Sequence, residues 1–437
     1  MKPGVSSGYM WMKAFIRING DMNIRKYIHH FLGLHKTGIV MLFLSIFLIQ
    51  QGCNKISNVE RSYFGFKEFG DTSNNLFQYI AHDQQNNIYY IENQSVYKTD
   101  SAILVKINPQ GKRIWRKTLY VNQTTKALQI FDTGDGLLIT FVLGTDQYHT
   151  YFGKTDYNGN LKWTQKLPME NGMNAAVGPN HTFMFFGIET ASQAMGAYCT
   201  DTSGKTIWTK VLGKAVNYVG DEPCTAGCYS KDGGFIFAGV DPFGINNEQQ
   251  SIIFKVDVHG NTQWVDTFPA DVYESDTPFV SGLGVVEAPD GQVYAVFGAS
   301  YTISTGSDYH IYIVKADPTS KTHDIQPVDF RFTALGSGFP SSGFYFGLSS
   351  DNNFYMAGQT DISGGLKHYN MFICKFDASY HQIFYNTYGG LYDVGGVVIP
   401  YMNGGFLLGV STSGFGKGYN KNDIAIMVTD GSGNLLN

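Results

Sequence analysis

The sequence predicts an all-β protein in which about seven four-stranded sheets form a closed ring, and three observations support this prediction. The composition suits short strands joined by tight turns, a unit of about 54 residues recurs along the chain, and one copy of that unit is split between the two ends. We therefore expect the 437-residue chain to carry one repeat domain rather than two or three ordinary domains.

The composition separates this chain from helical and nucleic-acid-binding proteins. It contains 51 Gly, 32 Phe and 28 Tyr, and only 15% of its residues are charged. A helical protein would need more Glu, Lys and Arg on its surface. The formal net charge is −5, and the chain after the N-terminal region has no Lys/Arg cluster to neutralise a phosphate backbone, so nucleic acid is not an expected partner.

The N-terminal region predicts export. Residues 38–49 are almost entirely apolar, follow Arg25 and Lys36, and are followed by Gly52-Cys53. This run is too short for a membrane-spanning helix, which needs about twenty residues, but it matches the apolar centre of a signal peptide. A small residue followed by Cys at this place resembles the lipobox of bacterial lipoproteins. The resemblance implies that Cys53 carries the lipid and anchors the protein in the cell envelope, at the outer membrane or cell surface; the alternative is an ordinary cleaved signal.

These features set the expected boundaries. Residues 1–52 are predicted to be a signal peptide, in which 1–21 is a start-site extension ahead of Met22. Residues 53–60 would form a short tether, and residues 61–437 would form the folded domain.

The repeat contains a recognisable hairpin. Four segments share an apolar strand, an Asp or Asn, a Gly three residues later and a Trp seven residues later. The Gly residues are Gly111, Gly159, Gly204 and Gly260, and the Trp residues are Trp115, Trp163, Trp208 and Trp264. Three degenerate copies surround Asp317, Asp377 and Asp430. Asp and Gly are expected to form the turn, with positive φ at Gly, and the Trp strand then covers the sheet.

A second hairpin precedes each of these, with turn residues such as Gly233, Gly291, Asn352 and Gly404. Two hairpins per repeat make four antiparallel strands, which is the composition of a β-propeller blade.

The two chain ends predict how the ring closes. The chain stops at Asn437, where a seventh Trp would stand, and residues 67–70 read like residues 210–213, the fourth strand of the third copy. An N-terminal strand that completes the C-terminal blade would remove two unpaired sheet edges.

The copies resemble the K-x-D-x-x-G-x-x-x-W repeats of β-propellers in bacterial extracellular proteins. The sixth copy, ending at Tyr385-Asn386-Thr387-Tyr388-Gly389-Gly390, is similar to the kind that ends Y-x-T-Y-x-G-G. The resemblance covers residues 62 to 437 and implies the architecture, but a shared fold does not imply a function.

The cysteines are not expected to form metal sites or local disulfides. If Cys224 and Cys228 lie on one strand, their Cα atoms are about 13 Å apart, beyond the limit of about 7 Å for a disulfide. Cys199 and Cys374 occupy the same position in two repeats and are predicted to be small buried apolar residues.

Binding is expected on one face of the ring. The hairpin turns are short and uniform, whereas the connections on the opposite face vary in length, and variable loops on a rigid scaffold commonly carry function. Tyrosines among Asn, Ser and Gly suit sugar rings and protein interfaces equally, although such rings also pack loops internally. The candidate ligand-binding residues are Tyr218, Tyr273, Tyr301, Tyr309, Tyr369 and Tyr392.

Four carboxylates are expected near the mouth of the channel because each falls shortly before an innermost strand. They are Asp71, Asp221, Asp276 and Asp393. Such a ring offers oxygen ligands for Ca²⁺; the alternative is a turn residue that bonds its own backbone. No other cofactor is expected.

No HExxH, GxSxG, P-loop or metal-spaced His cluster is present. We therefore predict a monomeric cell-envelope binding module for a glycan or a partner protein. One alternative is an exported enzyme, either a polysaccharide hydrolase or lyase with Asp221 and Asp276 as catalytic carboxylates, or a quinone-type oxidoreductase. Another is a structural scaffold of an envelope complex.

Overall fold

A computed structural model describes most of the chain between residues 65 and 436. The chain divides into two units, residues 1–62 and 63–437, and only the second contains described residues. The described ranges are 65–69, 74–96, 99–122, 126–143, 149–178, 182–192, 194–215, 224–241, 250–269, 279–303, 306–316, 323–326, 345–361, 369–388, 393–412 and 423–436. The predicted boundaries at residues 52 and 60 lie outside them. Within these ranges no helix is long and apolar enough to span a membrane.

Strands β1 to β27 form seven four-stranded antiparallel blades, which confirms the predicted all-β propeller. Blade 1 contains β2 (Asn74–His82), β3 (Ile88–Val96), β4 (Thr99–Ile107) and β5 (Arg113–Asn122). Blade 2 contains β6 (Lys126–Asp132), β7 (Leu137–Leu143), β8 (His149–Thr155) and the first part of β9 (Leu161–Val177). Blade 3 contains the rest of β9, β10 (Phe183–Glu189), β11 (Ala194–Thr200) and β12 (Thr206–Ala215).

The remaining four blades repeat this order. Blade 4 contains β13 (Cys224–Tyr229), β14 (Phe235–Asp241), β15 (Gln250–Val256) and β16 (Thr262–Pro269). Blade 5 contains β17 (Phe279–Glu287), β18 (Val293–Ile303), β19 (Gly306–Ala316) and β20 (His323–Gln326). Blade 6 contains β21 (Tyr345–Leu348), β22 (Phe354–Asp361), β23 (Tyr369–Phe376) and β24 (Gln382–Tyr388). Blade 7 contains β25 (Asp393–Pro400), β26 (Phe406–Thr412), β27 (Asp423–Val428) and β1 (Phe66–Phe69), with the short 3-10 turn η4 (Met402–Gly404).

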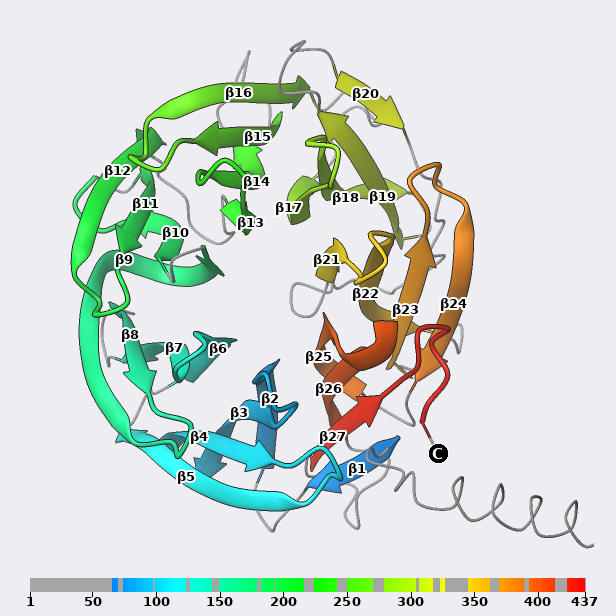
Figure 1. Cartoon of the computed structure of the whole chain (residues 1–437). Helices are drawn as coiled ribbons and strands as arrows, with labels where there is room; N and C mark the ends of the chain where they lie inside the picture. The colour runs from blue at the N-terminus through cyan, green and yellow to red at the C-terminus, as the bar shows by residue number, and fades with distance from the viewer. Residues whose placement is uncertain are drawn as a thin grey trace, which may run out of the picture. The chain divides into compact units, whose positions relative to one another are not determined.

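The first strand of each blade lies at the centre of the ring and the fourth lies at the rim (Figure 1). Blades 2 and 3 share β9, which pairs with β8 through Leu161–Glu170 and with β10 through Met169–Val177. One continuous strand therefore serves as the outermost strand of blade 2 and the innermost strand of blade 3, and these two blades form a single seven-stranded sheet.

The ring closes as predicted, because β1 supplies the fourth strand of blade 7. Lys67 lies opposite Ile426, just as Lys210 lies opposite Ala197 in blade 3. The C-terminal residues also pair with the end of β27. Leu436 N–H donates to Val428 C=O, and Val428 N–H donates to Gly65 C=O. Gly65 and Leu436 therefore meet opposite Val428, at the position where blades 1 to 4 place a Trp.

The turn of the repeated hairpin has the predicted geometry. Gly159 has a φ of +74°, and the preceding Asp156 carboxylate accepts hydrogen bonds from the backbone N–H groups of Asn158 and Asn160. In the degenerate sixth copy Tyr380 replaces the glycine and still adopts a φ of +64°, so the turn is kept where the motif is lost.

The repeated Trp packs between blades. A Cβ atom on Gly159 would lie 2.7 Å from the indole of Trp115 in the preceding blade, and the same relation joins Gly260 to Trp208. The indole N–H of Trp208 also donates to the carbonyl of Val258, at 2.7 Å. Gly and Trp of the motif are thus in contact across the interfaces between blades 1 and 2, 2 and 3, and 3 and 4.

The prediction that Cys199 and Cys374 are small buried residues is confirmed. Cys224 and Cys228 lie on the same strand, β13, opposite Gly239 and Ile236 respectively. Cys199 and Cys374 are free and almost fully buried, and burial raises the pKa of each thiol to about 12. They pack as small apolar side chains between blades.

Candidate functional site

The two faces of the ring differ in the length of their connections. The turns between first and second strands are compact, as in 83–87, 230–234, 288–292 and 349–353, and in each the first N–H donates to the fifth carbonyl. On the opposite face, the gap between second and third strands runs from two residues (304–305) to ten (413–422). Most of the length variation therefore lies on one face, as the sequence predicts.

Most sequence-predicted site residues lie outside the described part of the chain. This applies to Cys53, Tyr218, Tyr273, Tyr392, Asp71, Asp221 and Asp276. For four others the structure describes the backbone but not the side chain: Tyr301 in β18, Tyr309 in β19, Tyr369 in β23 and Asp393 in β25. All four are near strand ends on the long-loop face, and the backbones of Tyr301 and Tyr309 are neighbours across the β18–β19 pair. The proposed tyrosine set and Ca²⁺ ring stay predictions.

The carboxylates of the turn face bond to their own turns. Asp83, which is buried, accepts from the backbone N–H groups of Gln85 and Asn87 and from the Tyr89 hydroxyl. Among the described residues, no cluster of three or more His, Cys, Asp or Glu side chains is arranged to hold a metal ion. This face is built to hold its turns together.

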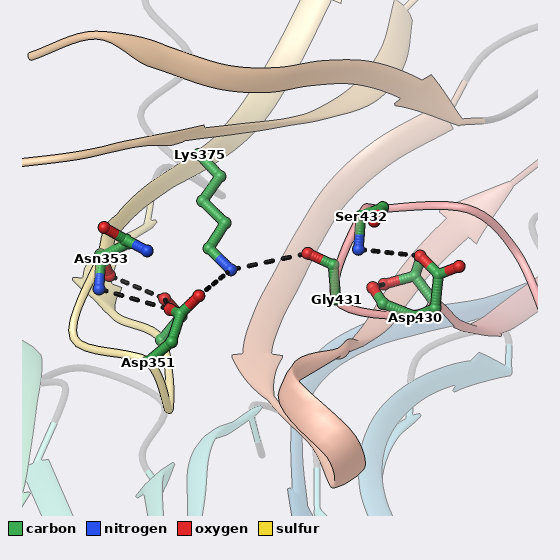
Figure 2. A network of polar contacts seen from close by, with 8 residues as sticks. Asp351, Asn353, Lys375, Asp430, Gly431 and Ser432 are labelled. Atoms are coloured by element: carbon green, nitrogen blue, oxygen red, sulfur yellow. Dashed lines mark hydrogen bonds and ion pairs between the residues drawn. The ribbon is translucent and has the colours of Figure 1, made fainter.

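The Lys of the K-x-D repeat supplies a second tie on this face. Lys375 donates to the Asp351 carboxylate at 2.8 Å and to the carbonyl of Gly431 in the next blade at 3.5 Å (Figure 2). Its side chain is only 4% exposed, whereas that of Asp351 is 51% exposed. Lys154 and Lys255 form the equivalent ion pairs in blades 2 and 4. The motif lysine thus joins the turn between the first and second strands to the third strand of the same blade. In blade 6 it also reaches the next blade.

We expect Lys375→Met to reduce the free energy of unfolding at neutral pH by about 1 kcal/mol. Partial burial acts to raise the pKa of Asp351, but hydrogen bonds from Lys375 and Ser349 outweigh it and hold the pKa well below its ordinary value. The ion pair therefore stabilises the fold above the unfolded-state pKa of about 4, and this contribution is lost as pH falls through the folded-state pKa.

Urea unfolding of wild type and Lys375→Met at a series of pH values measures this effect. The stability difference should shrink below about pH 4. Lys162→Met is the control, since its ion pair with Asp156 is more exposed on the lysine side and should contribute less. A difference between wild type and Lys375→Met that stays constant into acid would contradict the assignment.

Three aromatic rings from different blades meet at the inner edge of the ring. Tyr79 on β2 contacts Tyr345 on β21 edge to face, with ring centroids 6.0 Å apart, and contacts Phe131 on β6 at 5.7 Å. We call these three residues the aromatic arc. Blade 7 stands between blades 6 and 1 (Figure 1). Tyr345 packs against the apolar clusters on both sides of blade 7, so its ring passes that blade on the channel side of β25.

The arc is partly exposed although it lies on innermost strands. All three side chains keep some solvent contact. Burial raises the pKa of Tyr79 to about 12 and that of Tyr345 well above its ordinary value, so both phenols are neutral at physiological pH. No hydrogen bond joins either phenol to another residue within the described ranges.

Sequence reasoning did not find the arc, because its members are spread over some 270 residues and belong to no motif. A usable signal was present. Tyr79 and Tyr345 each stand four residues before the first residue of an inner turn, a position that the repeat alignment could have compared between copies. This shared position becomes apparent only when the first hairpins of all copies are aligned with one another.

Comparisons with known proteins support the fold class. No family model and no curated protein sequence matches the chain. A solved structure described as a polysaccharide lyase of family PL25, an ulvan lyase bound to -[GlcA(1-4)Rha3S]-, has a TM-score of 0.54 at 10% identity, covering 85% of this chain and 96% of that one. The propeller domain of the Trilobed protease from Pyrococcus furiosus has a TM-score of 0.48 at 11% identity, covering 82% of this chain and 95% of that one. At these identities the likeness is one of fold, and the chain is a closed seven-bladed β-propeller.

Proposed function

We propose that this protein is an exported, lipid-anchored binding module of the cell envelope that holds a glycan or a partner protein on its long-loop face. The observation that carries the proposal is the difference between the two faces. Turns on one face are uniform and bond internally, whereas connections of very different length gather on the other.

The closed ring supports a binding role because it makes a rigid platform. Blade 7 is joined to blade 1 by the same contact that joins blade 1 to blade 2. Phe77 N–H donates to the Ser411 hydroxyl at the first interface, and Ala127 N–H donates to the Asn93 side chain at the second, both at 2.8–2.9 Å. Such a ring holds the strand ends that carry its loops in fixed positions.

The export and anchoring parts of the proposal rest on the N-terminal sequence. The apolar run at residues 38–49 and the Gly52-Cys53 step support them. An envelope location also fits a chain in which Cys199 and Cys374 are free and buried, since buried thiols with raised pKa values react slowly.

One preparation tests the proposal. The full chain carrying Cys53→Ala should appear in the soluble exported fraction, whereas the wild-type chain should stay with membranes. The variant is then applied to an array of cell-wall, uronic-acid and sulfated polysaccharides, with Ca²⁺ and with chelator, while released sugar ends are measured. We expect specific binding that is reduced about tenfold or more by alanine at the loop tyrosines Tyr301, Tyr309 and Tyr369.

The other outcomes separate the alternatives. Membrane association that survives Cys53→Ala would reject the lipid anchor. Binding that is lost with chelator would favour the Ca²⁺ ring of Asp71, Asp221, Asp276 and Asp393. Release of sugar ends that stops on Asp221→Asn or Asp276→Asn would favour the enzyme alternative. Absence of any glycan binding would leave a partner protein as the ligand.

A further inference from the structure

The two tyrosines of the aromatic arc stand at a position where other blades carry non-aromatic residues. The position four residues before the inner turn is occupied by Ala226 in blade 4, Gly284 in blade 5 and Val397 in blade 7, all of them buried. A Cβ atom on Gly284 would lie 2.4 Å from Phe346, so blade 5 has no room for a side chain at this position, whereas blade 2 carries Gln129 there. Blades 1 and 6 instead carry large rings here, and those rings contact each other as well as the apolar clusters of the blade interfaces.

The arc is held firmly by its surroundings. Tyr79 packs against the apolar clusters on both sides of blade 1, and Tyr345 packs against those on both sides of blade 7. A β-bulge between Phe77 and Tyr79 interrupts the register of β2 immediately before Tyr79. The same irregularity precedes Gln129 in β6, Ala226 in β13 and Gly284 in β17, so the bulge is a feature of the repeat, and in blade 1 it stands before a large ring.

We infer that the aromatic arc of Tyr79, Phe131 and Tyr345 is a stacking site for a sugar ring within the channel of the propeller. The inference rests on the proposed function and deepens it, since it names a glycan rather than a protein as the ligand. The apolar face of a pyranose packs on aromatic rings, and its hydroxyls pair with phenol groups that donate and accept hydrogen bonds.

The position of the arc favours this occupant. The arc lies on the innermost strands of a closed ring, where a single saccharide chain would reach it more readily than a folded protein domain. The neutral state of both phenols removes charge as a source of affinity, so the site suits hydroxyl groups. The arc would take the end of a glycan whose remaining units lie on the long-loop face.

The test separates hydrogen bonding from packing. Tyr79→Phe and Tyr345→Phe keep the rings and remove only the hydroxyls. Binding of short soluble oligosaccharides, prepared from the polysaccharides that the array identifies, is measured by calorimetry with the full chain carrying Cys53→Ala. We expect each substitution to weaken binding by about three- to tenfold, with the unfolding temperature unchanged. Tyr385→Phe, on the outermost strand β24, is the matched control and should bind like the parent protein.

Two results would overturn the inference, and they are distinguishable. If the oligosaccharides bind the parent protein and both Phe variants with equal affinity, the arc is not the site, and the proposed function stands on the loop face alone. If no saccharide binds the parent protein, the glycan form of the proposed function fails and the arc assignment fails with it. A selective loss in Tyr79→Phe and Tyr345→Phe supports both.

Discussion

Deletion of Phe66–Phe69 is expected to lower the free energy of unfolding by about 3–6 kcal/mol and the unfolding temperature by roughly 5–10 °C. These residues form β1, which pairs with β27. Phe69 lies opposite Ile424, and Phe66 lies opposite Met427. Without β1, blade 7 has three strands over this length and β27 becomes an unpaired edge. The deletion also removes the contact between the rings of Phe69 and Tyr90, whose centroids are 5.8 Å apart.

Thermal unfolding followed by circular dichroism measures this change in the exported protein. A deletion of equal length within residues 54–61 is the matched control, because it shortens the chain ahead of β1 and leaves β1 in place. Phe66→Ala is a milder control, since that side chain is 38% exposed and should contribute little. Equal unfolding temperatures for wild type and the β1 deletion would show that the N-terminal strand does not close the ring.

The second large effect is expected at the glycine that lies under a Trp. Gly260→Ala should cost about 3 kcal/mol, because two separate penalties act at that position. The backbone has a φ of +76°, which an alanine adopts at a cost of about 1 kcal/mol. The new Cβ would also lie 2.7 Å from the Trp208 ring and 2.8 Å from the Lys210 side chain, so the blade interface has to shift.

Gly291→Ala isolates the backbone contribution. Gly291 has a φ of +85°, but a Cβ atom added there would meet no other atom within 4 Å, so this variant should lose only about 1 kcal/mol. Denaturant unfolding with unchanged slopes and shifted midpoints would give both values. Equal losses in the two variants would mean that the contact between blades has no energetic weight, and that the glycine serves its own turn alone.

The sequence was sufficient for the architecture because the information is local and repeated. Each copy carries the same apolar alternation and turn residues, so the hairpins, the blade count and the split blade follow from aligning them. The closing register of Lys67 with Ile426 agrees with that alignment. At residue 380 a Tyr stands in place of the expected glycine, and the turn is still formed because the surrounding strands impose the backbone conformation.

The candidate site was less accessible for two reasons. The tyrosines expected on the long-loop face, such as Tyr218 and Tyr273, lie outside the described residues, so their arrangement stays a prediction. The aromatic arc is described but was not expected, because alignment of the repeats compares copies and does not show which side chains cross from one blade to another.

The sequence by itself determined the all-β class, the seven blades, the closure by an N-terminal strand and the unpaired cysteines. Only the tertiary structure decided that the motif Trp lies on the glycine of the next blade, that Lys375 reaches Gly431, and that Tyr345 passes blade 7 to meet Tyr79. The physical reason is that a repeat encodes the fold of one blade, whereas contacts between blades depend on the ring geometry that brings distant copies together.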